Sequence, residues 1–240
     1  MATIDMAGTR QGSVAGAPPG PSLQVAGGIA ALLEGLALIG NLVLFLIVQP
    51  AMGFKMDYWD EPSKAVPFVV AHQSYFFFGG LFLIVSALIV PPIVLALYGR
   101  LRALSPGLIA TATFFGAIGT AMLLLNAIGQ YAEFHAFSSL STTVAEQAQP
   151  YGSIAYDATN EAGEVGLGLW ALLLSWAVVS RGGLPRWLGY FGLLVGAADL
   201  LMLIGLPIGL LLSIVWFIAV GVVLLRAPSV AAQGEPQAAI

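Results

Sequence analysis

The sequence contains no cysteine, and charged residues make up only 8% of its 240 residues. The absence of cysteine excludes disulfides, thiolate nucleophiles and metal sites built on cysteine ligands. Soluble domains usually carry about a quarter charged residues, so this chain cannot cover a globule of its size with charge. Because 59% of its residues are hydrophobic, lipid must be its solvent. The composition therefore predicts an integral membrane protein.

Positive charge is also scarce, with 8 Lys and Arg against 12 Asp and Glu. The few basic residues never gather into a patch, which argues against nucleic acid as a partner. The first 24 residues are rich in Gly, Pro and Ala and lack an apolar core, unlike a cleavable signal peptide. We expect residues 1–24 and 227–240 to be disordered tails on either side of one transmembrane domain at residues 25–226.

Long apolar stretches then predict the fold class, an all-α bundle of six transmembrane helices. A span needs about 20 mostly apolar residues to cross a hydrocarbon core about 30 Å thick. A polar helical extension is expected before the fourth span, and a tight turn at Gly205-Leu206-Pro207 after the fifth. The predicted spans cover residues 25–48, 75–98, 108–130, 163–180, 187–204 and 208–225.

The basic residues predict the orientation of these spans, because cytoplasmic loops retain Lys and Arg. One side of the six-span arrangement holds Arg10, Arg100, Arg102, Arg181, Arg186 and Arg226. The other side holds Lys55 and Lys64, together with most of the acidic residues. We therefore expect a multi-pass protein of a prokaryotic-type plasma (inner) membrane, with both termini in the cytoplasm.

Asp199 lies near the centre of the fifth predicted span, where nothing nearby in the sequence can solvate a carboxylate. Gly192 and Gly196 share its helical face, and Gly189 begins the same packing surface. This spacing of small residues lets another helix approach closely. We therefore expect Asp199 to face a neighbouring helix, away from lipid.

Glu34 is the matching acid in the first span, and Asn41 lies on the same helical face. Neither acid has a Lys or Arg within any span to pair with it. We expect one or both acids to be protonated at neutral pH, hydrogen-bonded to each other, to Asn41 or to Asn126. Such residues form either a polar clamp between helices or a proton or cation site in a transport path.

A second polar cluster is predicted at the outer surface. Two histidines and several carboxylates there suggest a Zn²⁺ site with a position open for water, as hydrolytic metal sites require. Alternatively, the histidines are ordinary interfacial residues and the acids face water, since neither histidine belongs to an HExxH-type pair. No other cofactor is expected. The candidate ligands are His72, Glu133, His135, Glu161 and Glu164.

The last three predicted spans resemble a known family. Residues 164–205 read as a Gly-rich helix, a short basic loop with the letters LPRWLG at Leu184–Gly189, and a second Gly-rich helix. This pattern is similar to the bacterial multi-pass membrane family called domain of unknown function 4386. The resemblance implies a six-span bacterial inner-membrane protein and supplies no catalytic residues.

Three functions from different classes remain open. The first is a membrane-embedded binding or accessory protein whose partners are lipids, other membrane proteins or further copies of itself. The second is a small proton- or cation-coupled transporter that uses Glu34 and Asp199. The third is a metal-dependent membrane enzyme at the outer His/carboxylate cluster. The lack of a recognised catalytic motif favours the first.

Overall fold

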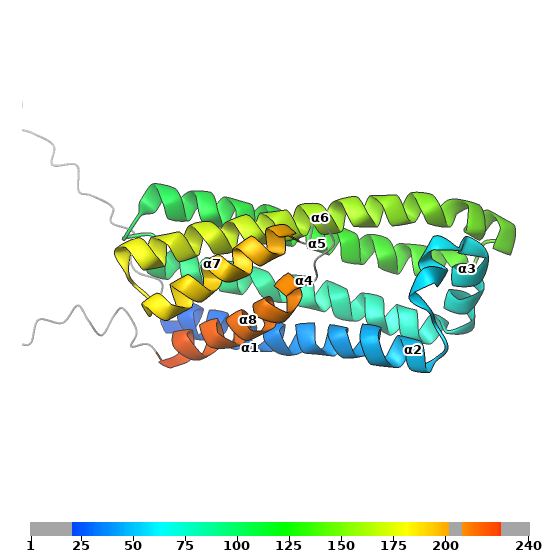
Figure 1. Cartoon of the computed structure of the whole chain (residues 1–240), viewed down its shortest axis with the longest axis horizontal. Coiled ribbons are helices and arrows are strands. Elements are labelled where there is room, and N and C mark those ends of the chain that lie inside the picture. The colour runs from blue at the N-terminus through cyan, green and yellow to red at the C-terminus, as the bar shows by residue number, and fades with distance from the viewer. Residues whose placement is uncertain (1–20, 202–207, 227–240) are drawn as a thin grey trace, which may run out of the picture.

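The chain folds into an elongated helical bundle, as shown by a computed structural model that describes residues 21–201 and 208–226 (Figure 1). Every element in these ranges is a helix, which confirms the all-α class. The predicted tails at 1–20 and 227–240 and the turn at 205–207 lie outside the described residues. The first helix begins at Pro21, earlier than the predicted Val25.

Four long helical segments form the frame of the bundle. The first is α1 (Pro21–Val43), which continues through the π-helical turn η1 (Leu44–Val48) into α2 (Gln49–Ala51). The other three are α4 (Gln73–Leu101), α5 (Pro106–Phe137) and α6 (Thr142–Arg181).

The remaining elements are shorter. A 3₁₀ turn η2 (Met56–Asp60) and α3 (Pro62–Ala71) connect α2 to α4. The chain ends with α7 (Arg186–Leu201) and α8 (Ile208–Arg226).

Proline and glycine set several of these helix ends. Pro62 and Pro106 occupy the first turns of α3 and α5, where the missing N–H has no helical partner to lose. Gly182 and Gly183, with φ of 86° and 87°, end α6 and turn the chain toward α7. Side chains with a Cβ rarely adopt such positive φ values, so glycine suits both positions.

The six main helices form a ring in which α1 packs on α4, α4 on α5, α5 on α6, α6 on α7, α7 on α8 and α8 on α1. At about 1.5 Å per residue, the 16 residues of α7 span only about 24 Å, whereas the 40 residues of α6 span about 60 Å. Both α7 and α8 therefore close the ring over only one half of its length (Figure 1).

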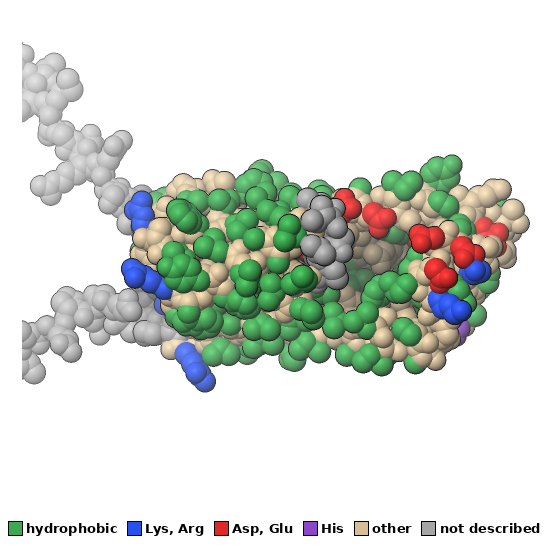
Figure 2. Space-filling model, viewed as in Figure 1, with side chains coloured by type: hydrophobic (Ala, Val, Ile, Leu, Met, Phe, Trp, Pro, Cys, Tyr) green, Lys and Arg blue, Asp and Glu red, His purple; other side chains and the backbone are tan. Residues whose placement is uncertain are grey.

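The two ends of the bundle differ in charge. Figure 2 shows blue Lys and Arg side chains without red ones at the end where α7 begins and α8 ends, and red acidic side chains, with some blue ones among them, from mid-length to the other end. We call the first the basic end, which holds Arg100, Arg102, Arg181, Arg186 and Arg226, and the other the far end. Arg100 donates a hydrogen bond to Gln24 Oε1 at 3.1 Å, which joins α4 to α1 at the basic end.

Glycines bring several of the ring helices into backbone contact. A Cβ placed on Gly166 of α6 would lie 2.6 Å from the Cα of Gly119 in α5. A Cβ on Gly196 of α7 would lie 2.6 Å from the carbonyl oxygen of Gly168 in α6. Small residues at such crossings are typical of helix packing in membranes, where the interfaces depend on close van der Waals contact.

The interior has two apolar cores. The larger lies in the half of the ring closed by α7 and α8, and includes the fully buried Trp170, Trp216 and Leu97. The smaller one, near the far end, packs α3 against α4, α5 and α6 through Val69, Phe76, Phe134 and their neighbours. Large apolar side chains also cover the outside, such as Phe78, which is 67% exposed.

This apolar exterior fits a multi-pass membrane protein. Five of the described helices are long and apolar enough to cross a membrane. They are Leu23–Ala51, Gln73–Leu101, Pro106–Phe137, Thr142–Arg181 and Ile208–Arg226. The fifth predicted span corresponds to α7, whose described part ends at Leu201.

Candidate binding cavity

A cavity of about 50 Å³ lies inside the bundle, where side chains from α1, α5, α6, α7 and α8 converge. Three carboxylates from three different helices line it: Glu34 from α1, Glu164 from α6 and Asp199 from α7. That volume has room for only a few water-sized groups, since one such group needs about 10–15 Å³. The cavity therefore joins the two acids singled out in the sequence with a third.

Serine hydroxyl groups hold two of these carboxylates. Ser86 Oγ of α4 donates to both oxygens of Glu34, at 3.0 and 3.1 Å. Ser213 Oγ of α8 donates to both oxygens of Asp199, at 3.2 and 3.4 Å. Both acids are buried, Glu34 at 4% and Asp199 at 5% exposure, so each depends on one neutral donor in a region of low polarity.

Glu164 differs from the other two because it forms no hydrogen bond with any described residue. Its carboxylate lines the cavity and is close enough to Asp199 for the two like charges to interact. A carboxylate out of bulk water gains stability from hydrogen bonds or from an opposite charge. Glu164, which is half-buried, is therefore the carboxylate of the cavity that is free of a hydrogen-bond donor among the described residues.

The rest of the lining supplies no positive charge. Among the described residues no Lys or Arg lines the cavity, and the wall is completed mainly by leucines and aromatic residues. Trp170 and Trp216 pack edge to face there, with their ring centroids 5.5 Å apart. Tryptophan rings attract cations more strongly than other aromatic side chains. The arrangement thus combines three carboxyl groups that have no basic partner in the described lining with an apolar, aromatic wall.

The two asparagines predicted to share hydrogen bonds with these acids have other positions. Asn126 Nδ2 donates to the carbonyl oxygen of Tyr156 at 2.9 Å, so it joins α5 to α6. Asn41 is half-buried on α1 and is not part of the cavity lining. The expectation that Asn126 would bond Glu34 or Asp199 was wrong, because Ser86 and Ser213 occupy that role.

The structure does not gather the five candidate metal ligands into one site. Among the described residues, no group of three or more His, Asp or Glu side chains could hold a metal ion. His72 stacks on Phe68, and its Nδ1 lies 3.0 Å from the Phe68 carbonyl oxygen. His135 is exposed, and the Glu133 carboxylate lies against Gly152 of α6.

The other two acids of that set lie along α6. Glu161 is exposed, whereas Glu164 belongs to the cavity instead of the outer surface. The prediction that Glu164 lies near His72 and His135 was wrong, because α6 is 40 residues long and Glu164 lies at about the middle of it.

The predicted glycine face of α7 lies against α6. Gly189, Gly192 and Gly196 are all buried, and their Cβ positions would approach Ser175 and the Gly168 carbonyl of α6. Asp199 continues this line of contacts, with its Cβ 3.2 Å from the Cβ position of Gly168. The close α6–α7 crossing therefore positions the Asp199 carboxylate beside the cavity.

The sequence reasoning missed Ser86, which holds Glu34, and the cavity residues Ser213, Trp170 and Trp216. A lone serine within an apolar span is a weak signal, because it satisfies its own hydroxyl by bonding to the helix backbone as readily as to a partner. Only the order of the helices around the ring shows which acid each serine meets.

The arrangement of long apolar helices around a polar cavity is that of a multi-pass membrane protein. The chain belongs to the family described as domain of unknown function DUF4386, whose model matches residues 33–206. No curated protein and no solved structure matches the chain. The match includes Glu34, Ser86, Glu164 and Asp199, whereas Ser213 lies beyond it.

Proposed function

We propose that this protein is a membrane-embedded binding protein whose cavity takes up a cation. The observation that carries the proposal is the convergence of Glu34, Glu164 and Asp199 on one cavity whose described lining has no Lys or Arg. A site of low polarity makes carboxylates costly to keep ionised, and Glu164 and Asp199 are close enough for their like charges to interact. A bound cation removes that cost and supplies the partner that Glu164 lacks.

The lining of the cavity favours an organic ammonium ion. A small metal ion is best held by several oxygen ligands close together, and the described residues include no group of three His, Asp or Glu side chains that could hold one. An ammonium ion suits a wall of carboxylates and two tryptophans, because carboxylates balance the charge and indole rings attract the ammonium group.

A proton- or cation-coupled transporter is the second candidate. It is favoured by the single-donor environments of Glu34 and Asp199, since a carboxylate held by one neutral hydroxyl can exchange its cation for a proton. In this function the same carboxylates would carry the proton and the cation in turn. Binding of the cation is common to both candidates, so it is the property to test first.

We also propose six spans, with the basic end in the cytoplasm of a bacterial cell. The support is the asymmetry of charge between the two ends and the rule that cytoplasmic loops retain Lys and Arg. In this arrangement α7 and α8 both cross the membrane, and the far ends of α5 and α6 rise above its outer surface. Membrane lipids surround the bundle, and further copies of the chain or other membrane proteins are its other proposed partners.

The test is a thermal-shift titration of the detergent-purified protein with tetramethylammonium. At a concentration of 100 times Kd, a ligand that binds only the folded state adds about 2.7 kcal/mol. For a chain of this size that raises Tm by about 5–11 °C. We expect the shift in the parent protein and in Asp60→Asn, an exposed acid at the far end, and its loss in Glu164→Gln and Asp199→Asn. Equal shifts in all four proteins would contradict the proposal.

A further inference from the structure

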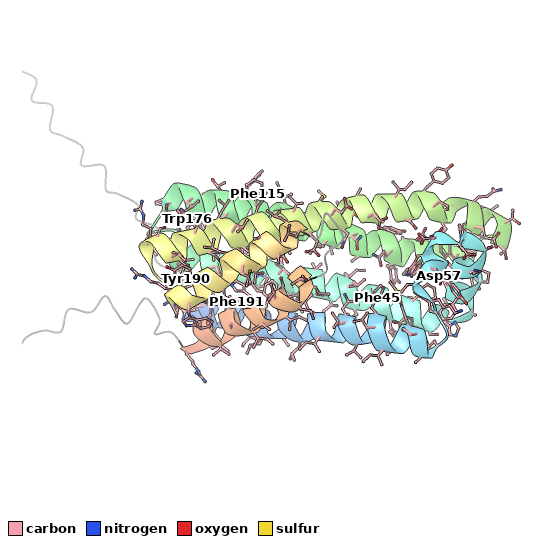
Figure 3. All side chains as sticks on the ribbon, in the orientation of Figure 1. Phe45, Asp57, Phe115, Trp176, Tyr190 and Phe191 are labelled. Carbon is pink, nitrogen blue, oxygen red and sulfur yellow. The ribbon has the colours of Figure 1, made fainter. Side chains whose placement is uncertain are left out.

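A second, smaller cavity lies between α6, α7 and α8, in the half of the ring that α7 and α8 close. We call it the small cavity. Its volume is about 10 Å³, and a single water molecule needs about 10–15 Å³. Its lining residues Ser175 and Gly189 face the interior, while the next residues of the same helices, Trp176 and Tyr190, are exposed (Figure 3). The small cavity shares one lining residue, Trp216 of α8, with the carboxylate cavity.

Two buried polar atoms in the wall of the small cavity have no hydrogen-bond partner among the described residues. They are Ser175 Oγ and Trp216 Nε1, in side chains that are 1% and 2% exposed. A serine within a helix usually satisfies its hydroxyl on its own backbone, as Ser180 Oγ does by donating to the Trp176 carbonyl oxygen at 2.7 Å. Polar groups left unpaired inside a membrane protein are costly, because no bulk water reaches them. Ser175 and Trp216 therefore need a partner that the described chain does not supply.

Gly192 of α7 brings these two polar atoms together. A Cβ placed on Gly192 would collide with Ser175 Oγ and would lie 2.7 Å from Trp216 Nε1. Both atoms therefore approach one point on α7, where only a residue without a side chain leaves room for them. Since a hydrogen bond spans about 2.7–3.0 Å, the two atoms are close enough for one small molecule to bond to both.

The size and the charge of the small cavity select its ligand. The indole N–H of Trp216 can only donate, so the ligand must be an acceptor, which excludes a simple cation. None of the described lining residues is charged, so an anion would have no counter-charge. From these limits we infer that one water molecule binds in the small cavity, where it accepts a hydrogen bond from Trp216 Nε1 and forms another with Ser175 Oγ.

The bound water joins α6 to α8 through their side chains. It holds the edge of the Trp216 ring, which also lies in the wall of the carboxylate cavity and packs edge to face on Trp170. Water with two polar partners of this kind is a regular part of protein interiors. The water site goes beyond the proposed cation binding and does not depend on it.

X-ray radiolysis of the full chain in lipid nanodiscs, followed by mass spectrometry, tests for the bound water. X-rays split water into hydroxyl radicals, which oxidise the side chains next to the water that produced them. Leu188 is 2% exposed and lines the small cavity, whereas Leu97 is 0% exposed and lines neither cavity. We expect Leu188 to be oxidised several times faster than Leu97 in the parent protein, because the bound water lies beside Leu188. Equal rates would overturn the inference.

A pair of variants tests whether Ser175 holds the water. Ser175→Val replaces the hydroxyl with methyl groups that fill the small cavity, whereas Ser180→Val makes the same change at an exposed serine of the same helix. We expect only Ser175→Val to lower the oxidation rate of Leu188 to that of Leu97. An unchanged rate in Ser175→Val, or an equal fall in both variants, would overturn the inference. If Ser175→Val fails to fold, Ser175→Cys takes its place with the same expected fall, because a thiol is only a weak hydrogen-bonding group.

Discussion

A glycine substitution at the α5–α6 crossing tests how closely these helices pack. In Gly166→Ala the new Cβ would lie 2.6 Å from the Cα and 2.7 Å from the backbone nitrogen of Gly119. Carbon atoms in favourable contact are about 3.5–4.0 Å apart, so the two helices must separate by about 1 Å. Backbone atoms cannot rotate away as a side chain can. Overpacking of this kind typically costs about 1–3 kcal/mol.

Gly79→Ala is the matched control, because its Cβ would have no atom within 4 Å. Both glycines lie inside helices, so the gain in helix propensity of up to about 1 kcal/mol is common to both variants and cancels in the comparison. At about 2–4 °C per kcal/mol for a chain of this size, Gly166→Ala should melt about 2–12 °C below Gly79→Ala. The assay is thermal unfolding of both purified variants in one detergent. Equal melting temperatures would refute the close backbone contact.

Three further predictions concern orientation, pH and metal. Because the chain has no cysteine, a single introduced thiol reports the side of the membrane on which it lies. Ser139→Cys at the far end should react with a membrane-impermeant thiol reagent on intact cells, whereas Ala103→Cys at the basic end should react only after the cells are permeabilised. The reverse pattern would invert the proposed orientation. Protonation removes the negative charge to which a cation would bind, so tetramethylammonium affinity should fall as the pH is lowered in a dialysis assay, and affinity that rose would contradict binding to carboxylates. Zn²⁺ should shift Tm equally in the parent protein and in His135→Ala, since His135 belongs to no metal-ligand group among the described residues. A shift that is lost only in His135→Ala would support the hypothesis of a metal site at the outer surface.

Most of the helices could be predicted from the sequence because lipid-facing helices need long apolar runs. The apolar stretch from Leu108 to Gln130 became the centre of α5, and the polar extension expected before the fourth span became the first part of α6. The full length of α6 was harder to predict, because its first half is polar and contains Pro150, which lies inside the helix. Composition alone does not show that such a segment continues as one helix.

The cavity could be predicted only in part. The position of Asp199 on the glycine face of its helix correctly indicated a neighbour, because small residues mark close crossings. That neighbour is α6, which carries Glu164, and the contact between the two helices places Glu164 and Asp199 in the wall of the same cavity. Periodicity shows which residues share a face of one helix, but it does not show the order of helices around a ring. For that reason Glu164 was grouped with His72 and His135, and the serine partners were missed.

The central claim is that the cavity lined by Glu34, Glu164 and Asp199 binds one cation, and its most direct test is equilibrium dialysis of radiolabelled tetramethylammonium against the purified protein. The account predicts saturable binding of one ion per chain. It also predicts no saturable binding to a Glu164→Gln/Asp199→Asn double variant that elutes as the same species in size-exclusion chromatography. Undiminished binding to the double variant, or no binding to the parent protein, would contradict it.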